Sequence, residues 1–399
     1  MPERADLLIV GAGCIGGWAA TLAAREGAGR VVVLDAERAG WGASPRAAGI
    51  VRAQGGTPTA VELAQWSIAF YERQREELGI DSAFRRLGYL ILAFGPEDEA
   101  AARERLAMQA GCGLPSRRLS PEEAARLNPL LDPSAISGAT YCELDGAIDP
   151  PRNVTAYVTA MRAAGAELRE GVRVTALRLQ DGRVRGVETG AGAFEAERVL
   201  LAGGWGQRTL SAMAGGRGVP IGAVRHQVAV TGPHPRLAGA PLPMGFDLGA
   251  GLYWRQEEDG LLFGMSNPAE APGEATAIDW RMLEEIRARL GTLLPLTREL
   301  ELRRLWAATI DYSPDHLPIL GPALDAAGEP VEGLWLASAS GHGMMWGPGV
   351  ARAAVDLALR GATEVTDTLF LGADRFDDAG RSTLQIDPIA LPFPEAAEG

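Results

Sequence analysis

Three glycines near the N-terminus have the spacing of a loop that binds the phosphates of a dinucleotide. Gly11, Gly13 and Gly16 form a G-x-G-x-x-G pattern, and Asp35 follows at roughly the 20-residue distance at which an acid reaches the adenosine ribose. The first glycine permits a tight turn and the second lets the backbone approach a pyrophosphate, while Gly16 allows a helix to pack closely on a strand. The chemistry predicted here is dinucleotide binding.

The elements that must position this loop are also apparent in the sequence. Residues 6–10 are a short apolar run typical of a buried parallel strand, an alanine-rich amphipathic helix runs to about Glu26, and residues 30–34 form a second strand that ends at Asp35. The N-terminus of such a helix offers N–H donors and the positive end of a dipole to phosphate. In this context the glycine pattern is a strong signal, whereas alone it would be weak.

The segment after Asp35 favours FAD over NAD. Residues 40–49 form a loop of small residues at the place where an NAD-binding domain would continue its alternating strands and helices. Such a loop lets the chain wrap around a bound dinucleotide and reach an isoalloxazine ring. We therefore expect FAD as the cofactor.

Length, composition and charge exclude several other classes of protein. A chain of 399 residues suggests two domains, and its formal net charge of −13 argues against a nucleic-acid partner. All 38 basic residues are arginine, which excludes pyridoxal phosphate Schiff-base chemistry and a P-loop because both need a lysine. The few cysteines and histidines show no disulfide framework and no metal-ligand spacing, so we expect no metal.

One uncharged stretch, Gly333 to Ala351, is long enough to be considered as a membrane span. It contains five glycines, Pro348, two serines and His342, so we interpret it as a buried loop followed by the start of a helix. No signal-peptide pattern follows Met1. We expect a soluble, cytoplasmic protein.

Three further segments follow in a characteristic order. Residues 170–174 have the pattern of a short strand, residues 197–205 that of a strand running into a glycine-rich turn, and residues 313–321 precede a final strand, a Gly-His-Gly turn at 341–343 and a helix from about Pro348. Together with the dinucleotide unit and the small-residue loop, these segments resemble the D-amino-acid oxidase superfamily of FAD enzymes. The resemblance is nearest to its glycine oxidase and sarcosine oxidase beta-subunit branch and covers nearly the whole chain.

The resemblance implies a two-lobed α/β (α+β) fold, in which a Rossmann-like FAD-binding domain carries an inserted substrate domain with an antiparallel sheet. We expect the FAD-binding domain at 1–83, 150–223 and 311–365, the substrate domain at 84–149 and 224–310, and a C-terminal tail at 366–399. Within the substrate domain, residues 226–231, 252–255 and 261–265 alternate like strands, and a helix is predicted from about Asp279 to Leu294. We expect the end of the tail to lie on the surface or fray.

The resemblance also implies the contacts to FAD. The backbone around Val174 contacts adenine, and Gly341 to Met344 face the pyrimidine edge of the flavin, where a helix N-terminus stabilises negative charge. Positions at which some relatives attach FAD covalently match Ala308 and Arg46, so we expect FAD to be non-covalent. The predicted FAD contacts are Gly11, Gly13, Cys14, Ile15, Gly16, Asp35, Ala36, Gly42, Ser44, Arg46, Ala48, Gly49, Val174, Ala202, Gly203, Gly204, Trp205, Gly341, His342, Gly343 and Met344.

Two residues that relatives use to hold a substrate carboxylate are replaced here. Ile310 stands where the glycine oxidase branch has an arginine, and Met345 stands where the sarcosine oxidase branch has a lysine. Arg52 is at the position of another carboxylate-binding arginine of sarcosine oxidases. Because a buried arginine needs an anionic partner, Arg52 should face either a substrate anion or a structural acid.

Three more residues are candidates for the substrate site. Tyr253 matches an active-site tyrosine of related amino-acid dehydrogenases, although it is otherwise an ordinary aromatic residue of a sheet. His226 and Arg225 point to opposite sides of one strand, so only one of them can reach the pocket. His342 either acts as a base over the flavin or bonds the backbone. The candidate catalytic residues are therefore Arg52, Tyr253, His342, Met345 and His226.

The resemblance implies oxidation of the C–N bond of an amine or amino acid by hydride transfer to flavin N5, followed by hydrolysis of the imine. The default substrate is a secondary or N-methyl amino acid such as sarcosine, or a compound like glycine or proline. Leu262 stands where sarcosine oxidases place a lysine that promotes reaction with oxygen, so the acceptor is either oxygen or another molecule. Two alternatives stay open: an FAD-dependent dehydrogenase of a 2-hydroxy acid or other non-amine donor, and a flavin subunit of a larger hetero-complex. The sequence does not indicate an oligomeric state.

Overall fold

The short apolar runs near the N-terminus form neighbouring parallel strands. The computed structural model of the chain describes residues 2–384, and its first sheet places β2 (Leu7–Val10) between β3 (Val31–Leu34) and β14 (Val199–Leu201). This sheet has the order β1-β13-β12-β21-β14-β2-β3-β10, with β11 paired to β12 and β20 paired to β21. The remaining strands of this sheet are β1 (Glu3–Arg4), β10 (Glu167–Arg169), β11 (Val174–Gln180), β12 (Arg183–Thr189), β13 (Gly192–Glu195), β20 (Ile319–Leu324) and β21 (Pro330–Ser338).

The alternation of side chains along these strands builds two separate cores. Leu7 and Ile9 pack with Trp18 of α1 (Cys14–Arg25), whereas Leu8 and Val10 pack on the opposite face, toward β12 and β13. The helices on the α1 side approach closely, since a Cβ at Gly17 would lie 2.3 Å from the ring of Tyr157 in α5. The other helices of this lobe are α2 (Pro58–Leu78), α5 (Pro150–Ala163), α6 (Gln207–Ala212) and α8 (Gly343–Arg360).

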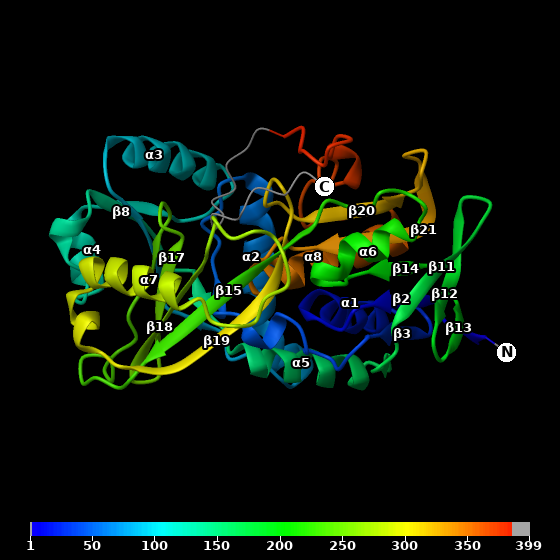
Figure 1. Ribbon diagram of the computed structural model, residues 1–399, viewed down its shortest axis with the longest axis horizontal. Helices are drawn as coiled ribbons and strands as arrows, with labels where there is room; N and C mark the ends of the chain where they lie inside the picture. The colour runs from blue at the N-terminus through cyan, green and yellow to red at the C-terminus, as the bar shows by residue number, and fades with distance from the viewer. Residues whose placement is uncertain (1, 385–399) are drawn as a thin grey trace.

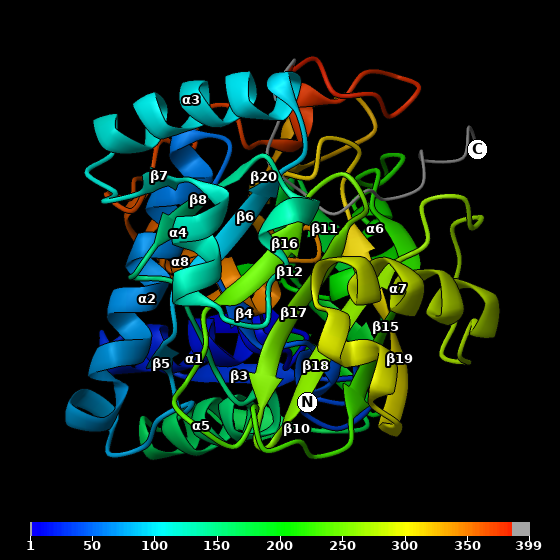
Figure 2. The same cartoon turned by 90° about the vertical axis from the view of Figure 1, so that its left-hand side faces the viewer.

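A second sheet forms the other lobe, on the left of Figure 1. Its order is β19-β15-β18-β17-β16-β6-β8-β7, and its pairs are antiparallel except for the parallel pair β16–β6. Helices α3, α4 and α7 lie on the outer side of this sheet (Figure 2). The elements are β6 (Tyr89–Ala93), α3 (Pro96–Gly111), β7 (Arg117–Leu119), α4 (Pro121–Leu127), β8 (Gly138–Cys142), β15 (Gly222–Thr231), β16 (Met244–Asp247), β17 (Leu252–Glu257), β18 (Gly260–Ser266), α7 (Trp280–Leu293) and β19 (Leu302–Tyr312).

A small third sheet and several single turns connect the two lobes. The third sheet has the order β4-β9-β5, and its strands are β4 (Ile50–Val51), β5 (Arg85–Arg86) and β9 (Gly146–Ala147). The 3-10 turns are η1 (Ser44–Arg46), η2 (Pro133–Ala135), η3 (Gly204–Gly206), η4 (Pro295–Glu299) and η5 (Ala373–Arg375). No helix within residues 2–384 is both long and apolar enough to span a membrane.

The two-domain α/β architecture predicted from the sequence is confirmed, and so is the helix expected near Asp279. Asp279 caps α7 by accepting the N–H of Met282 at 3.1 Å. The exact domain boundaries stay a prediction. Residues 366–384 were expected to belong to a tail, but they pack against the rest of the protein: Leu371 is fully buried and Arg375 is almost fully buried. The end of the predicted tail lies outside the described residues.

Two predicted elements are wrong. Residues 170–173 form a turn between β10 and β11 rather than a strand, because Gly171 adopts a left-handed φ of 71° and its N–H bonds Glu37. Helix α8 begins at Gly343 and not near Pro348, whereas the final strand expected before the Gly-His-Gly turn is present as β21. Pro348 has no N–H for the carbonyl of Met344, which accepts the Tyr71 hydroxyl at 2.9 Å instead.

Candidate active site

A cavity of about 880 Å³ extends along the sequence-predicted loops of the first sheet and reaches the second sheet. Its first part is lined by the turn after β2, the segment after β3, residues 40–49 and the turn after β14. Its second part is lined by residues of β4, β6, β15, β16, β17 and β19, together with the turn that leads into α8. Segments far apart in the sequence therefore contribute to one site.

The glycine loop after β2 leaves no room for a side chain at Gly11. Gly11 has a φ of 104°, and a Cβ there would lie only 2.4 Å from the carbonyl oxygen of Ala202. Gly13 lines the cavity directly before α1, where the Ser44 hydroxyl accepts the N–H of Cys14 at 3.0 Å. This bare backbone at a helix N-terminus fits a pyrophosphate.

Gly16 and Arg46 are the two predicted FAD contacts that, within residues 2–384, do not line the cavity. A Cβ at Gly16 would lie 1.9 Å from the carbonyl oxygen of Gly11, so this glycine serves the packing of α1 against the loop. The Arg46 guanidinium turns back to the carbonyls of Trp41 and Gly42, the latter at 2.7 Å. Gly16 and Arg46 thus lie outside the cavity lining, whereas the other predicted FAD contacts belong to it.

The Asp35 carboxylate lies at the cavity and is already held by the backbone. One oxygen accepts the N–H of Ala12 at 2.7 Å and the other accepts the N–H of Glu37 at 2.8 Å. Burial raises the pKa of Asp35, and these two hydrogen bonds oppose that shift. Each oxygen keeps a lone pair for a further donor, as the predicted bond from a ribose requires.

The turn into α8 carries His342, whose ring is fixed on two sides. The Nδ1 atom lies 2.7 Å from the Ser340 carbonyl oxygen, and the ring stacks on Trp346 with centroids 4.2 Å apart. A carbonyl only accepts, so Nδ1 carries the hydrogen and Nε2 has none. Burial and the charge of Arg52 lower the pKa of His342 to about 3, which keeps the ring neutral. The backbone bond expected for His342 is thus present, and the residue also lines the cavity.

Arg52 brings a buried positive charge to the second part of the cavity. Its side chain is 4% exposed, donates to the carbonyl of Gln54 and lies 5.7 Å from the centroid of the Phe246 ring. Asp145 lies close behind, where it accepts the N–H of Ala53 at 2.6 Å and Gln54 Nε2 at 2.9 Å. Burial raises the pKa of Asp145 to about 6, although these bonds and the Arg52 charge act in the opposite direction.

His226 and Tyr253 form a hydrogen-bonded pair on neighbouring parts of the second sheet. His226 Nε2 lies 2.5 Å from the Tyr253 hydroxyl, and Nδ1 lies 2.8 Å from the Ser266 hydroxyl. Burial lowers the pKa of His226 to about 4 and raises that of Tyr253 well above its usual range, so both are neutral near pH 7. Arg225, the neighbour of His226 in β15, instead pairs with Glu270. Of the two, His226 is the one that lines the cavity.

The replaced carboxylate anchors leave an apolar lining. Ile310 and Met345 both line the cavity with only 9% and 8% of their surface exposed. The lining also includes reactive and aromatic side chains that were not predicted as site residues, among them Trp41, Tyr89, Phe246, Thr309 and Asp311. Asp311 directly follows the stretch that contains Ile310, so its position was a usable signal. Tyr89 and Phe246 resemble ordinary strand residues in the sequence, so no sequence signal marked them as part of the site.

Comparisons with known proteins agree with this geometry. The family model DAO, described as FAD dependent oxidoreductase, matches residues 6–357. The mitochondrial dimethylglycine dehydrogenase of Rattus norvegicus is 30% identical over 378 residues, which are 90% of this chain and 43% of that protein. The chain thus spans less than half the length of this relative.

Two solved structures resemble the chain over nearly its whole length. L-proline dehydrogenase from P. horikoshii has a TM-score of 0.86 at 26% identity, with 94% of this chain and 98% of that one covered. Glycine oxidase from Geobacillus kaustophilus has a TM-score of 0.81 at 26% identity, with 94% and 100% covered. With the glycine cradle at β2 and the turn into α8, these matches show that the chain belongs to the DAO family of FAD-dependent oxidoreductases.

Proposed function

We propose that this chain uses FAD to oxidise the C–N bond of a secondary or N-methyl amino acid. The observation that carries the proposal is the grouping, around one cavity, of a buried arginine with neutral histidines and a tyrosine. Arg52, His226, Tyr253 and His342 all line the same cavity as the glycine loop. The relatives described above act, by their names, on dimethylglycine, L-proline and glycine, which are all amino acids.

Arg52 is the residue that would hold the substrate carboxylate. It is a buried cation on the cavity wall, and the two anchors used elsewhere in the family are the apolar Ile310 and Met345. A carboxylate that reaches Arg52 would therefore form a charge-assisted hydrogen bond in a water-poor site. The rings of Tyr89 and Phe246, with centroids 6.3 Å apart, supply apolar surface beside it.

The neutral histidines suit a substrate that must react as a free amine. Bound FAD supplies the acceptor for a hydride from the carbon next to nitrogen, and a protonated amine cannot release that hydride. His342 presents Nε2 without a hydrogen, and His226 is kept neutral by burial. Because neither imidazole carries a positive charge and the surroundings are buried, the site favours binding of the uncharged amine.

We further propose that oxygen is a slow acceptor and that another molecule takes the electrons. Leu262, at the position of the oxygen-activating lysine of sarcosine oxidases, is 1% exposed and belongs to an apolar cluster that includes Val228 and Val230 of β15. The chain contains no lysine that could replace it. FAD is proposed to be dissociable, since Ala308 and Arg46 offer no ordinary attachment chemistry.

The experiment is anaerobic mixing of the FAD-loaded protein with matched donors. N-methylglycine and proline should bleach the visible absorption of oxidised flavin, whereas the corresponding 2-hydroxy acids should leave it unchanged. Bleaching by hydroxy acids alone would replace the proposal with the hydroxy-acid alternative. Admission of air then measures the oxygen reaction, and rapid return of the colour would contradict the proposed slow acceptor step.

A further inference from the structure

The turn between β21 and α8 is held in a conformation that its sequence disfavours. Ser340 has a φ of 47°, a left-handed value that residues other than glycine rarely adopt. It is fully buried, and its carbonyl holds the Nδ1 hydrogen of His342. Such a conformation persists only where the surroundings fix it. The position of His342 therefore depends on what holds Ser340.

Ser313, which follows β19, contacts the Ser340 hydroxyl with both its N–H and its own hydroxyl. The Ser313 N–H donates to Ser340 Oγ at 3.0 Å, and the two hydroxyl oxygens are 3.1 Å apart. Ser313 Oγ is closest to the Leu317 carbonyl, at 2.7 Å, and donates its one hydrogen there. The Ser340 turn is thus tied to the turn at 313–317.

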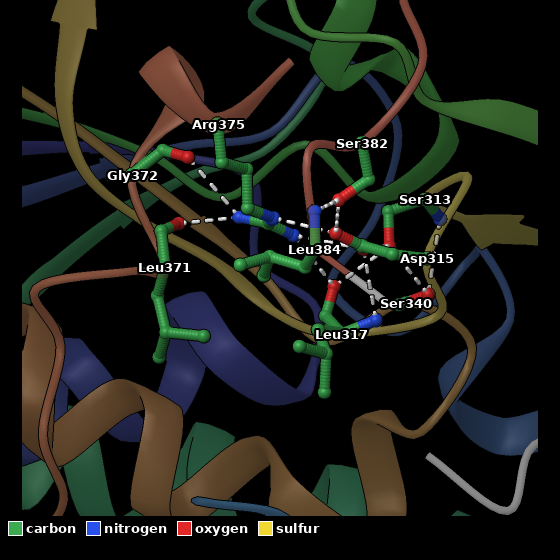
Figure 3. Close-up of polar contacts among 9 residues, drawn as sticks. All are labelled: Ser313, Asp315, Leu317, Ser340, Leu371, Gly372, Arg375, Ser382 and Leu384. Carbon is green, nitrogen blue, oxygen red and sulfur yellow. Dashed lines mark hydrogen bonds and ion pairs between the residues drawn. The ribbon is translucent and has the colours of Figure 1, made fainter. Parts of the chain in front are cut away.

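A buried ion pair fixes that second turn, as Figure 3 shows. Arg375 Nε and Nη2 donate to the two oxygens of Asp315 at 2.7 and 3.0 Å, with side chains only 3% and 4% exposed. Asp315 also accepts the N–H of Leu317 and the hydroxyl of Ser382. Burial by itself would raise the pKa of Asp315, but the bonds and charge of Arg375 outweigh it and lower the pKa, so the pair is ionised.

The arginine of this pair comes from a segment beyond the part of the chain that matches the family model, which ends at residue 357. Arg375 Nη1 donates to the carbonyls of Leu371 and Gly372 at 2.6 and 3.2 Å, and Nη2 also reaches the Leu317 carbonyl at 3.3 Å. Every nitrogen of the guanidinium therefore has an acceptor. The segment after α8 is fastened in this way to the turn that holds Ser313.

We propose that Asp315 and Arg375 are positioning residues of the flavin site, acting through Ser313 and Ser340 on the turn that carries His342 and the first N–H groups of α8. Gly341, His342 and Gly343 line the cavity, so a shift of this turn moves both the neutral imidazole and the helix N-terminus. The inference rests on FAD binding and not on amine oxidation. Its test is therefore independent of whether the proposed reaction is correct.

The test compares Arg375→Met with Arg289→Met in apoprotein titrated with FAD. Arg289 serves as the control, because it also pairs with a buried carboxylate, Asp247, at 2.6 Å and stacks on Phe94 as Arg375 stacks on Phe376, although its side chain is 38% exposed and that of Arg375 is 3% exposed. Within the described chain, the Arg289 pair does not line the cavity. We expect Arg375→Met to weaken FAD binding by roughly tenfold and to shift the visible bands of bound flavin. Arg289→Met should lower the melting temperature without either change.

Two further variants keep the test decisive. Ser382→Ala removes one hydrogen bond to Asp315 and keeps the ion pair, so it should fold and weaken FAD binding slightly in the same direction. Ser340→Ala removes the hydroxyl that links this turn to Ser313, so it should weaken FAD binding in the same direction, and the Ser340→Ala and Arg375→Met double variant should be little worse than Arg375→Met alone. Equal losses of FAD affinity in the Arg375 and Arg289 variants at equal melting temperature, or fully additive losses in the double variant, would overturn the proposal.

Discussion

The two parts of the cavity are built from different parts of the chain. Near the first sheet, the cavity is lined mainly by backbone: by glycines, of which Gly11 and Gly49 have no space for a Cβ, and by the N-termini of α1 and α8. Near the second sheet, the cavity is lined mainly by side chains. Arg52 from the segment after β4, His226 from β15 and Tyr253 from β17 meet there. The comparison teaches that few amino-acid types are tolerated at the tightest positions of the backbone part. In the side-chain part, by contrast, single replacements can change which substrate the protein binds.

The largest effect is expected where a side chain would fill the backbone part. Gly11→Ala places a Cβ 2.4 Å from the Ala202 carbonyl at a φ of 104°, so it should abolish FAD binding and lower stability by more than about 2 kcal/mol. Gly27→Ala is the control, because Gly27 has a φ of 75° but nothing within 4 Å of its Cβ position. FAD titration and thermal melting distinguish them. Normal FAD binding by the Gly11 variant would refute the backbone account.

This difference also explains how much the sequence could predict. Gly11, Gly13 and Asp35 lie in one continuous unit, so their spacing carries the geometry. Tyr89 and Phe246 come from β6 and β16, whose parallel pairing no local pattern reveals. His226 and Tyr253 were predicted as candidates, but their 2.5 Å contact depends on the two strands that pair with β18.

In the same way, the sequence indicated the turn into α8 but not what holds it. The Gly-His-Gly turn and the helix were expected from their residues, yet the start of α8 was placed too late because Pro348 suggested a helix beginning. The Asp315–Arg375 pair joins two segments through a buried contact that carries no spacing signal. Long-range side-chain contacts are the part of the site that only the folded chain shows.

The next largest effect is expected in the side-chain part, at Arg52. Arg52→Gln should lower kcat/KM by about 10- to 100-fold for amino acids, since a charge-assisted hydrogen bond to the carboxylate is lost. The same variant should act almost normally on the matching amine without a carboxylate. Steady-state kinetics with N-methylglycine and dimethylamine measure the difference. An equal loss for both donors would contradict a carboxylate contact.

A smaller and coupled effect is expected for the His226–Tyr253 pair. Tyr253→Phe and His226→Gln should each slow flavin reduction by roughly tenfold, because each breaks the 2.5 Å contact between them. The double variant should be little worse than either single one, since both remove the same interaction. Rapid-mixing measurements of flavin bleaching give the rates. Fully additive losses would show that the two residues act separately.

The smallest effect concerns stability as a function of pH. His226 and His342 have folded-state pKa values lowered to about 4 and about 3 from 6.5, so their contribution is present above pH 6.5 and is lost as pH falls toward these values. Asp145, with its pKa raised to about 6 from 3.8, acts oppositely: its contribution is lost as pH rises from 3.8 to 6. The contribution of the two histidines should exceed that of Asp145, so the free energy of unfolding should rise from pH 4 to 6.5.

Variants separate these opposing contributions. In chemical unfolding at a series of pH values, His226→Gln should flatten the rise in the free energy of unfolding, because one of the two histidines no longer contributes. Asp145→Asn should make the rise steeper between pH 4 and 6, since the opposing carboxyl is gone. Identical pH profiles in the wild type and both variants would contradict the assigned pKa shifts.

The central claim is that one cavity joins a backbone site for FAD to a side-chain site for an amino acid. It is tested most directly by a crystal structure of the FAD-loaded protein with a slowly reacting N-methyl amino acid analogue. The account predicts the pyrophosphate at Gly11 and Gly13, and the ligand carboxylate at Arg52 with its nitrogen toward His226 or His342. A carboxylate bound away from Arg52, or FAD bound outside this cavity, would contradict it.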